Sequence, residues 1–314
     1  MNRTLDSLNR VLHNIGGVGQ DTAATYDVNG NALTITDPLA RVTQVAYDAL
    51  DRPLQATDPA AGVTTVAYDV QDRLASVTDA NAKSTNYVYD GFGRLISEVS
   101  PVAGIKVYRY DASGNLTQRV DARGVIANFT YDALDRRLTT TYPGNSAENV
   151  TAFYDGSLHG FGIGQLTTVL DAVGTLNRNY DERGNRILEI RQGSINSTTS
   201  YAYDDAGRLN SITYPSGWLI SYVRDQMGRN TAITAKPPGG NTFIVVSAIT
   251  YLPFGPMRAL TYGNSLTETR TYDLDYRLTG IAVNGGGSRL SLTYGYDAAN
   301  NVKAVTDGTD SAKT

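Results

Sequence analysis

The sequence predicts an all-β protein made of tandem β-hairpin repeats, joined into a coiled ribbon of sheet that forms part of a hollow shell or a solenoid. Three observations favour this fold class. The dipeptide Tyr-Asp recurs at a fixed interval, the apolar side chains before each Tyr alternate with period two, and turn-forming residues follow each Asp. No stretch of ten or more residues keeps a helical period, so no helix is expected.

The repeat interval divides the chain into two parts. Six Tyr-Asp pairs recur every 21 residues, and Leu5-Asp6 lies another 21 residues upstream with Leu in the Tyr position. The later units are 21 to 27 residues apart. We therefore interpret 1–314 as a single repeat array, with regular 21-residue units over about 5–150 and irregular units with insertions over about 151–314.

Each unit contains two short strands. In the arm before the Tyr, apolar residues two positions apart, such as Val66 and Tyr68, lie on one face of a strand. A turn phrase such as GFGR or ASGN follows, whose Gly or Asn tolerates the positive φ of a tight hairpin. The second arm ends in a breaker such as Asp58-Pro59. This arm alternates less cleanly, and the pattern does not assign its faces.

The number of units predicts the coiling of the sheet. Fourteen units give about 28 strands, and at ~4.8 Å per strand the ladder would run on the order of 130 Å. Open twisted sheets rarely exceed ~10 strands without curling or closing. The ribbon is therefore expected to coil, with stability distributed along the array rather than held in one core.

The composition provides few residues for catalysis or metal binding. The chain has 314 residues, no Cys and two His, which excludes disulfides, Cys-ligated metal sites and thiol nucleophiles. His13 and His159 both fall in expected loops, and the sequence indicates no catalytic or metal-binding partner for either. We therefore expect no cofactor, no metal site and no enzymatic activity.

Charge and hydropathy limit the partners. Lys and Arg number 27 against 31 Asp and Glu, a net charge of −4, and both signs are scattered along the chain. Nucleic acid is not expected to bind, because phosphate recognition needs a concentrated cationic surface. The N-terminal segment lacks the apolar core of a signal peptide, and no stretch approaches the ~20 apolar residues of a membrane span.

The repeated residues are interpreted as structural positions. The Tyr residues are expected to form a packing ladder with cross-strand aromatic pairs, and exposed rings that bind carbohydrate are the alternative. The Asp residues are expected to accept hydrogen bonds from turn amides. Arg52, Arg73, Arg94, Asn115, Arg136 and Arg208 are expected to pair with these Asp residues, with a basic binding stripe as the alternative. The predicted structural positions are Tyr26, Asp27, Tyr47, Asp48, Tyr68, Asp69, Tyr89, Asp90, Tyr110, Asp111, Tyr131, Asp132, Tyr203 and Asp204.

The repeat phrase resembles the Rhs/YD-repeat family. It appears as YDVQDRLASVTD, YDGFGRLISEVS, YDASGNLTQRVD and YDDAGRLNSITY, and the recurrence covers essentially the whole chain. The family includes bacterial Rhs polymorphic toxins, the C-component of insecticidal toxin complexes, and the extracellular part of teneurins. The resemblance implies β-hairpin repeats wound into a hollow cocoon around a toxin domain, or into a barrel on an adhesion receptor.

One departure from the toxin members limits what the resemblance implies. Their shell closes with a D-P-x-G segment of a self-cleaving protease region followed by a variable toxin, whereas Asp37-Pro38 and Asp58-Pro59 here are repeat breakers. Because the chain also begins and ends inside a unit, we interpret it as a fragment of a larger protein.

The predicted function is structural. We expect a non-enzymatic segment of an Rhs-type shell that encapsulates or presents a polypeptide cargo, within a secreted or cell-surface parent. Its partners would be the rest of the parent polypeptide and the enclosed C-terminal cargo, with self-association through open sheet edges. The alternative is a cell-surface adhesion or carbohydrate-binding module that uses exposed Tyr residues.

Overall fold

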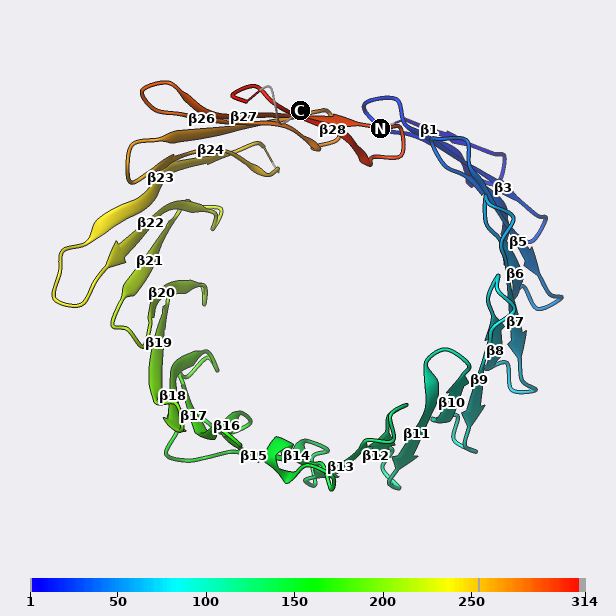
Figure 1. Cartoon of the computed structure of the whole chain (residues 1–314), viewed down its shortest axis with the longest axis horizontal. Coiled ribbons are helices and arrows are strands. Elements are labelled where there is room, and N and C mark those ends of the chain that lie inside the picture. Colours follow the sequence, from blue (N-terminus) through cyan, green and yellow to red (C-terminus); the bar gives the residue numbers. More distant parts are fainter. Residues whose placement is uncertain (1, 254, 311–314) are drawn as a thin grey trace.

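The computed structural model describes residues 2–253 and 255–310, and it consists almost entirely of β-strands (Figure 1). The regular units contain β1 (Asn2–Leu5), β2 (Val11–Ile15), β3 (Asp21–Tyr26), β4 (Ala32–Thr36), β5 (Val42–Tyr47), β6 (Pro53–Thr57), β7 (Val63–Tyr68), β8 (Leu74–Thr78), β9 (Ser84–Tyr89), β10 (Leu95–Ser100), β11 (Gly104–Tyr110), β12 (Leu116–Val120), β13 (Ile126–Tyr131) and β14 (Arg137–Thr141).

The irregular units follow after a single turn of 3-10 helix, Ser146–Glu148. They contain β15 (Val150–Tyr154), β16 (Leu166–Asp171), β17 (Gly174–Tyr180), β18 (Arg186–Gly193), β19 (Ser197–Tyr203), β20 (Leu209–Thr213), β21 (Leu219–Arg224), β22 (Asn230–Lys236), β23 (Phe243–Tyr251), β24 (Met257–Tyr262), β25 (Thr267–Tyr272), β26 (Leu278–Asn284), β27 (Ser288–Tyr296) and β28 (Val302–Asp307). The all-β prediction is confirmed.

All 28 strands of the described residues belong to one antiparallel sheet. Each strand pairs with the next one along the chain, from β1 with β2 to β27 with β28. Two kinds of turn therefore alternate along the ribbon. We call the turn that begins with the Asp of a Tyr-Asp pair a YD turn, and the edge that these turns form the YD rim. The turns between units form the opposite edge, the inter-unit rim.

A β-bulge recurs next to the YD turns and not in most of the pairings between units. In the hairpin of β7 and β8, Ala67 lies opposite Ser76 while Tyr68 lies opposite Leu74, so Ala75 is the extra residue. The same register shift stands beside the Tyr in β9–β10, β11–β12 and β13–β14. A bulge bends its strand and increases the twist, so its regular repetition supplies curvature to the ribbon.

The bulge also explains why the second arm of each unit lacks clean alternation. One extra residue exchanges the two faces of all residues that follow it. In β8 the residues are all half-buried, whereas β7 alternates between exposed and half-buried positions. A period-two pattern is therefore clearer in the arm before the Tyr, although β4 keeps it in a second arm.

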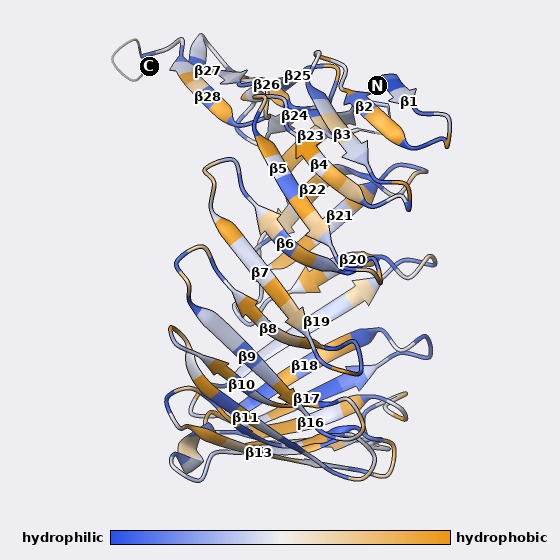
Figure 2. Ribbon diagram, turned by 90° about the vertical axis from the view of Figure 1, so that its right-hand side faces the viewer, coloured by the Kyte–Doolittle hydropathy of each residue, from blue (hydrophilic) through white to orange (hydrophobic). Residues whose placement is uncertain are grey.

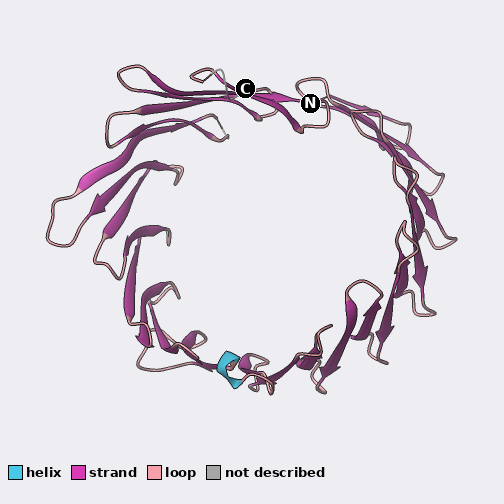
Figure 3. Cartoon of the chain, in the orientation of Figure 1, coloured by secondary structure: helices cyan, strands magenta, loops and turns pink. Residues whose placement is uncertain are grey.

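The ribbon curves through a full circle. Figures 1 and 3 show a ring of strands in which the first and last strands overlap in the view along the ring axis, and the 3-10 turn Ser146–Glu148 (η1) is drawn as a helix. Figure 2 shows these two ends displaced along the ring axis, so the ribbon rises as it turns. The predicted coiled ribbon is confirmed, and Met1 and residues 311–314 of the predicted mid-unit ends lie outside the described residues.

The ring has no solid core. Only Ala127, Phe129, Gly162, Thr167, Tyr180, Ala235, Ile249 and Glu268 fall below about a tenth exposed among the described residues. At ~4.8 Å per strand, a turn of roughly 24 strands gives a circumference on the order of 115 Å and a diameter of about 37 Å. Side chains of the wall cannot fill such a width, so the interior is hollow.

One residue assignment from the sequence is wrong. His13 was expected in a loop, but it lies in β2, where its Nδ1 is 2.8 Å from Asp21 Oδ2 of β3. The phrase around it has Leu5 in the Tyr position, and the strand that follows the first turn was therefore not recognised.

Candidate functional site

The repeated Tyr-Asp-Arg cluster is the most frequent polar arrangement in the chain, and the turn of Asp90 illustrates it. Asp90 Oδ1 accepts hydrogen bonds from the backbone N–H groups of Phe92 (2.9 Å) and Arg94 (3.0 Å). Arg94 Nε donates to Asp90 Oδ2 at 2.7 Å. The Asp therefore satisfies the turn amides and holds the Arg in place.

The Arg of each cluster reaches into the next unit. Arg94 Nη1 donates to the backbone oxygen of Asp111 at 2.8 Å, and its guanidinium carbon lies 4.9 Å from the centre of the Tyr110 ring. The Tyr110 hydroxyl donates to the backbone oxygen of Leu95 at 2.9 Å, next to Arg94. Tyr, Asp and Arg thus form a relay that connects neighbouring units, in which the Arg covers the ring of the following Tyr.

The other predicted positions lie in the same relay. Asp48, Asp69, Asp132 and Asp204 pair with Arg52, Arg73, Arg136 and Arg208, and Asp27 and Asp111 bond Asn31 and Asn115 instead. Arginines of the preceding units stack on Tyr26, Tyr68 and Tyr89. Hydroxyls that donate to a carbonyl 15 or 17 residues upstream belong to Tyr26, Tyr47, Tyr68, Tyr131 and Tyr203.

The expected pairing of one aromatic ring with another is wrong. Among the described residues the structure holds one close ring pair, Trp218 with Phe243 at 6.0 Å between centroids, and it contains no Tyr. The β-bulge and the interleaved Arg separate successive Tyr rings. An Arg side chain is therefore the stacking partner, and arginines of the alternative basic stripe, such as Arg52, Arg73 and Arg94, form the ion pairs with Asp that were expected.

The Tyr residues of the repeat positions do not form an exposed row. Those named above are half-buried, whereas the exposed tyrosines of the described part of the chain, Tyr214 and Tyr276, stand outside the Tyr-Asp positions. This arrangement does not favour carbohydrate binding through the repeated Tyr residues.

The hydrogen bonds of the relay lower the pKa values of the Asp carboxyl groups. The pKa of Asp48 lies below its ordinary value, mainly because the Arg52 side chain donates to it and because turn amides do the same. The pKa of Asp132 is lowered chiefly by the backbone N–H of Arg136, against the opposing effect of burial. Both carboxylates therefore stay ionised over a wider pH range than free Asp.

Sequence reasoning missed part of the relay. Arg224 occupies a Tyr position, and its Nη2 donates to the backbone oxygen of Leu209, 15 residues upstream, as the Tyr hydroxyls do. Asp51, Asp72 and Asp135 adopt positive φ in their turns and accept bonds from Asn31, Arg52 and Asn115 of the preceding units. Their fixed place three residues after each Asp was visible as a signal in the sequence.

A second feature is the seam where the ribbon meets its own beginning. The turn between β2 and β3, residues 16–20, contacts the YD turn between β25 and β26. Asp275 accepts hydrogen bonds from the backbone N–H of Gly17 at 2.7 Å and from Gln20 Nε2 at 2.7 Å. Gln20 also bonds Asn300 Oδ1 at 3.0 Å in the last YD turn. An inter-unit turn therefore sits against two YD turns.

The glycines of the seam permit this close approach. A Cβ on Gly17 would lie 2.9 Å from both Leu274 Cβ and Asp275 Oδ1. Gly17 has no positive φ, so this contact and not the backbone conformation excludes a side chain.

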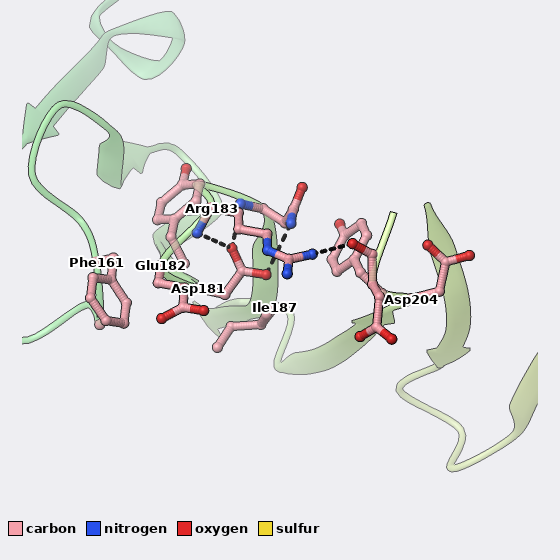
Figure 4. A pocket seen from close by; sticks show the side chains of 11 residues that line it. Phe161, Asp181, Glu182, Arg183, Ile187 and Asp204 are labelled. Carbon is pink, nitrogen blue, oxygen red and sulfur yellow. Dashed lines mark hydrogen bonds between the residues drawn. The ribbon is translucent and has the colours of Figure 1, made fainter. Parts of the chain in front are cut away.

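An open pocket of about 510 Å³ lies between the YD turns of Asp181 and Asp204 (Figure 4). Its wall includes Asp181, Glu182 and Asp205 together with Phe161. Asp181 accepts bonds from its own turn amides, and Arg183 Nη1 donates to the backbone oxygen of Asp205. No group of three or more His, Cys, Asp or Glu in the described part of the chain could hold a metal ion. The Asp181 carboxylate therefore has a structural role in its own turn.

His159 helps to hold the insertion beside this pocket. Residues 155–165 lengthen one YD turn, and Gly160 forms a parallel bridge with Tyr180. His159 Nδ1 lies 2.9 Å from the backbone oxygen of Arg178. The insertion therefore extends the sheet edge at β17, consistent with the loop expected here.

Comparison with known protein families shows which family models match the chain. The model of the family described as Teneurin YD-shell matches residues 1–159, and that described as RHS Repeat matches residues 180–217. No curated protein matches the chain. No helix of the described residues is long and apolar enough to cross a membrane.

Solved structures share the fold. The crystal structure of TcdB2-TccC3-Cdc42 is 18% identical over 98% of this chain with a TM-score of 0.86. A Photorhabdus luminescens Tc holotoxin pore is 17% identical over 98% of the chain with a TM-score of 0.83. In both cases this chain spans 18% of the length of the matched chain.

Proposed function

Because the chain belongs to the teneurin YD-shell family, we propose that it forms one turn of the wall of a hollow shell that encloses or presents a polypeptide cargo. The wall role is structural and needs no catalytic residue. The shell would act as part of a secreted or cell-surface protein, together with the rest of that polypeptide and its cargo.

The observation that carries the proposal is the closed turn with an unfilled interior. Gly17 and Asp275 are in contact although 258 residues separate them, which brings the ribbon back to its start. Few residues of the described chain are buried, so the wall is one sheet thick. A single-layer ring with a diameter of about 37 Å has room for an extended or partly folded polypeptide.

The contacts between neighbouring units support the proposed role as part of a wall. In units such as that of Asp90, the Arg binds the Asp of its own turn and stacks on the next Tyr, so the same contacts join many of the units to their neighbours. Stability in such arrays is a sum of units and their interfaces, which permits a long curved wall without a central core.

The first experiment tests the closed turn. Because the chain has no Cys, spin labels can be attached at Val18→Cys and Leu274→Cys without removing native thiols. Both side chains are exposed. We expect a short, narrow distance distribution for this pair. The control pair is Val18, in the turn between β2 and β3, with Leu134, in the turn between β13 and β14; these strands lie across the ring from each other (Figure 1), so this pair should give a far longer distance than the first.

A second measurement tests the cargo. A flexible reporter polypeptide joined after residue 314 should be digested more slowly than the same reporter on a globular carrier. A long, broad distance for the first pair would contradict the closed wall. Digestion at the carrier rate with a short distance would contradict cargo enclosure alone.

A further inference from the structure

The two faces of the sheet are exposed to different extents. Residues two and four positions before each Tyr share a face with it, which we call the Tyr face. On this face Ala127 is 1% and Glu268 is 5% exposed, whereas Ala46 and Ala67 on the opposite face are exposed. Side chains on the concave side of a curved sheet converge and cover one another, and those on the convex side separate. The Tyr face therefore lines the ring, and the opposite face is its outer face.

An aliphatic patch lies on the outer face of β9 to β13. Its members lie opposite one another or one strand apart in the strand register, and they are Val88, Val99, Ile105, Val107, Val120 and Ile126. The exposed fractions lie between 38% and 56% for Val88, Val99, Ile105 and Ile126. Single exposed apolar residues are ordinary on protein surfaces, whereas a contiguous group of them is typical of an interaction surface.

The patch differs from the same repeat positions in other units. Val99 and Val120 occupy one position near the end of the second arm, and that position is occupied elsewhere by Thr36, Thr57, Thr78 and Thr141. Val107 likewise corresponds to Asn86 and Asn128 of the neighbouring units. The hairpins form equally with Thr or Asn at these positions, so folding of the unit does not explain the aliphatic residues.

One unpaired charge lies at the margin of the patch. Arg109 follows Val107 by two positions on the same face and is exposed. Within the described residues its side chain has no ion pair or hydrogen bond. Gln118 lies opposite Arg109 and Asn128 lies opposite Gln118, and both are neutral. A surface that covers the patch therefore gains from a carboxylate at this place.

We propose that the patch and Arg109 form a docking surface for an amphipathic helix of another protein, whose aliphatic face lies on the patch and whose carboxylate pairs with Arg109. The five strands of the patch span about 19 Å. A helix of about 13 residues has this length and repeats its aliphatic side chains every ~5.4 Å, close to the strand spacing. This docking goes beyond the proposed wall function, which uses the inner face and the contacts between units.

The first test measures the binding of two synthetic helical peptides to the full chain by fluorescence anisotropy. Both peptides carry Leu along one helical face, and they differ only in having Glu or Lys beside that face. We expect the Glu peptide to bind about fivefold more tightly, because it brings the opposite charge to Arg109 and the Lys peptide brings a like charge. Arg109→Glu should reverse this order. Equal affinities for the native chain, or an order that Arg109→Glu leaves unchanged, would overturn the proposal.

The patch variant Val99→Thr, Ile105→Ser, Val120→Thr tests the apolar contact. Each substitution installs the residue type that another unit carries at that position, so the fold should be retained, which circular dichroism checks. We expect the affinity for the Glu peptide to fall by about tenfold. The control variant Val42→Ser, Val63→Ser changes exposed residues at the repeat position of Ile105 outside the patch, and it should bind as the native chain does.

The variants also separate the helix from other occupants of the patch. Unchanged binding of the Glu peptide to the patch variant would overturn the proposal. A mass that rises with concentration in sedimentation only when the patch is intact would assign the patch to a second copy of the chain, and would overturn it as well. Neither result would affect the distance test of the wall.

Discussion

The regular units are joined mainly by one repeated Asp–Arg–Tyr contact, whereas the irregular units keep it in some places and add ion pairs that do not repeat. Up to Tyr131, most YD turns use an Arg that binds the Asp of its own turn and stacks on the Tyr of the next unit, and two turns use an Asn instead. Arg229 and Arg277 make the same two contacts in the irregular half. Beyond Val150, ion pairs that do not repeat become frequent. Arg178 and Arg186 share Glu189, and Arg191 bonds Asp171.

Burial differs in the same way. In the described residues, Ala127 and Phe129 are the buried side chains of the regular units, whereas Thr167, Tyr180, Ala235, Ile249 and Glu268 lie in the irregular ones. Glu268 accepts bonds from the Tyr262 hydroxyl and from Arg270 Nε. The comparison teaches that an even spacing permits one repeated contact to fix the whole array. Where the spacing changes, additional ion pairs and individual buried residues supplement this contact.

Of the changes considered, low pH is expected to have the largest effect on the difference in stability between the regular and the irregular units. Turn carboxylates such as Asp48 and Asp132 have lowered pKa values in the folded chain, with the Arg52 side chain and the Arg136 backbone N–H as the respective main causes. Their contribution to stability is present above the ordinary value of 3.8 and is lost as the pH falls through the folded-state pKa.

Below about pH 4 we therefore expect the regular units to open first, because buried apolar groups such as Ile249 retain stability in the irregular units. Hydrogen exchange at decreasing pH measures the order. If the irregular strands opened first, the repeated relay would not be the main source of stability in the regular half.

Truncation of a Tyr should cost more in the irregular half. Tyr180 is 8% exposed and its hydroxyl donates to the backbone oxygen of Leu166 at 2.7 Å. We expect Tyr180→Ala to lower the free energy of unfolding by ~3–5 kcal/mol. Tyr110 is only half-buried, so Tyr110→Ala should cost about 2 kcal/mol. Local opening energies from hydrogen exchange in β17 and β11 measure both.

A matched variant isolates the ring from its hydroxyl. Tyr180→Phe keeps the ring and removes one hydrogen bond, for which we expect a loss of about 1 kcal/mol. Equal losses for the two Ala variants would mean that the two halves bury their Tyr residues to the same extent in solution.

Removal of one Arg tests whether the relay reaches the next unit. Arg94→Ala removes the bonds to Asp90 and to the Asp111 oxygen together with the stack on Tyr110, and we expect a loss of ~1–2 kcal/mol. Protection from exchange should fall in β11 and β12 as well as in β9 and β10.

Two variants serve as references for this Arg. Arg94→Lys should not restore the stability, because an ammonium group cannot bind Asp90 and cover the ring in the same geometry. Arg109→Ala, at an exposed strand position, should change stability by no more than ~0.5 kcal/mol. A loss confined to β9 and β10 would show that the units are not coupled through the Arg.

The sequence predicted the hairpin array and its coiling because both depend on spacing. Twenty-one residues between Tyr-Asp pairs fix two strands and two turns for each unit, whatever the side chains contact. The Asp–Arg pairing was predicted for the same local reason, since residues four apart close one turn. The bulge was not predicted, because the irregular alternation of the second arm does not by itself distinguish an extra residue from other causes.

The sequence did not allow us to predict that Arg is the stacking partner of the Tyr, or that the ribbon contacts its own beginning at the seam. Arg94 and Tyr110 are 16 residues apart and meet only after the bulge has set the register of the neighbouring hairpins. Gly17 and Asp275 meet only because the sum of many small curvatures completes a circle. No local sequence pattern indicates the total curvature of the ribbon.

The smallest expected effect concerns the inter-unit turns. In the regular units, Ala40, Ala61 and Ala82 adopt φ of 60°, 65° and 58°, and the corresponding place in an irregular unit is occupied by Gly217 at 81°. A left-handed backbone strains a residue that has a Cβ, and Gly relieves the strain. We expect Ala82→Gly to stabilise the chain by ~0.5–1 kcal/mol, measured as a higher thermal midpoint.

Ala80→Gly, two residues earlier and without positive φ, should instead destabilise it by a similar amount, because Gly only adds freedom to the unfolded chain. Two variants that shift the midpoint in the same direction would mean that the turn at Ala82 relaxes in solution, and the regular half would then store no strain at its inter-unit rim.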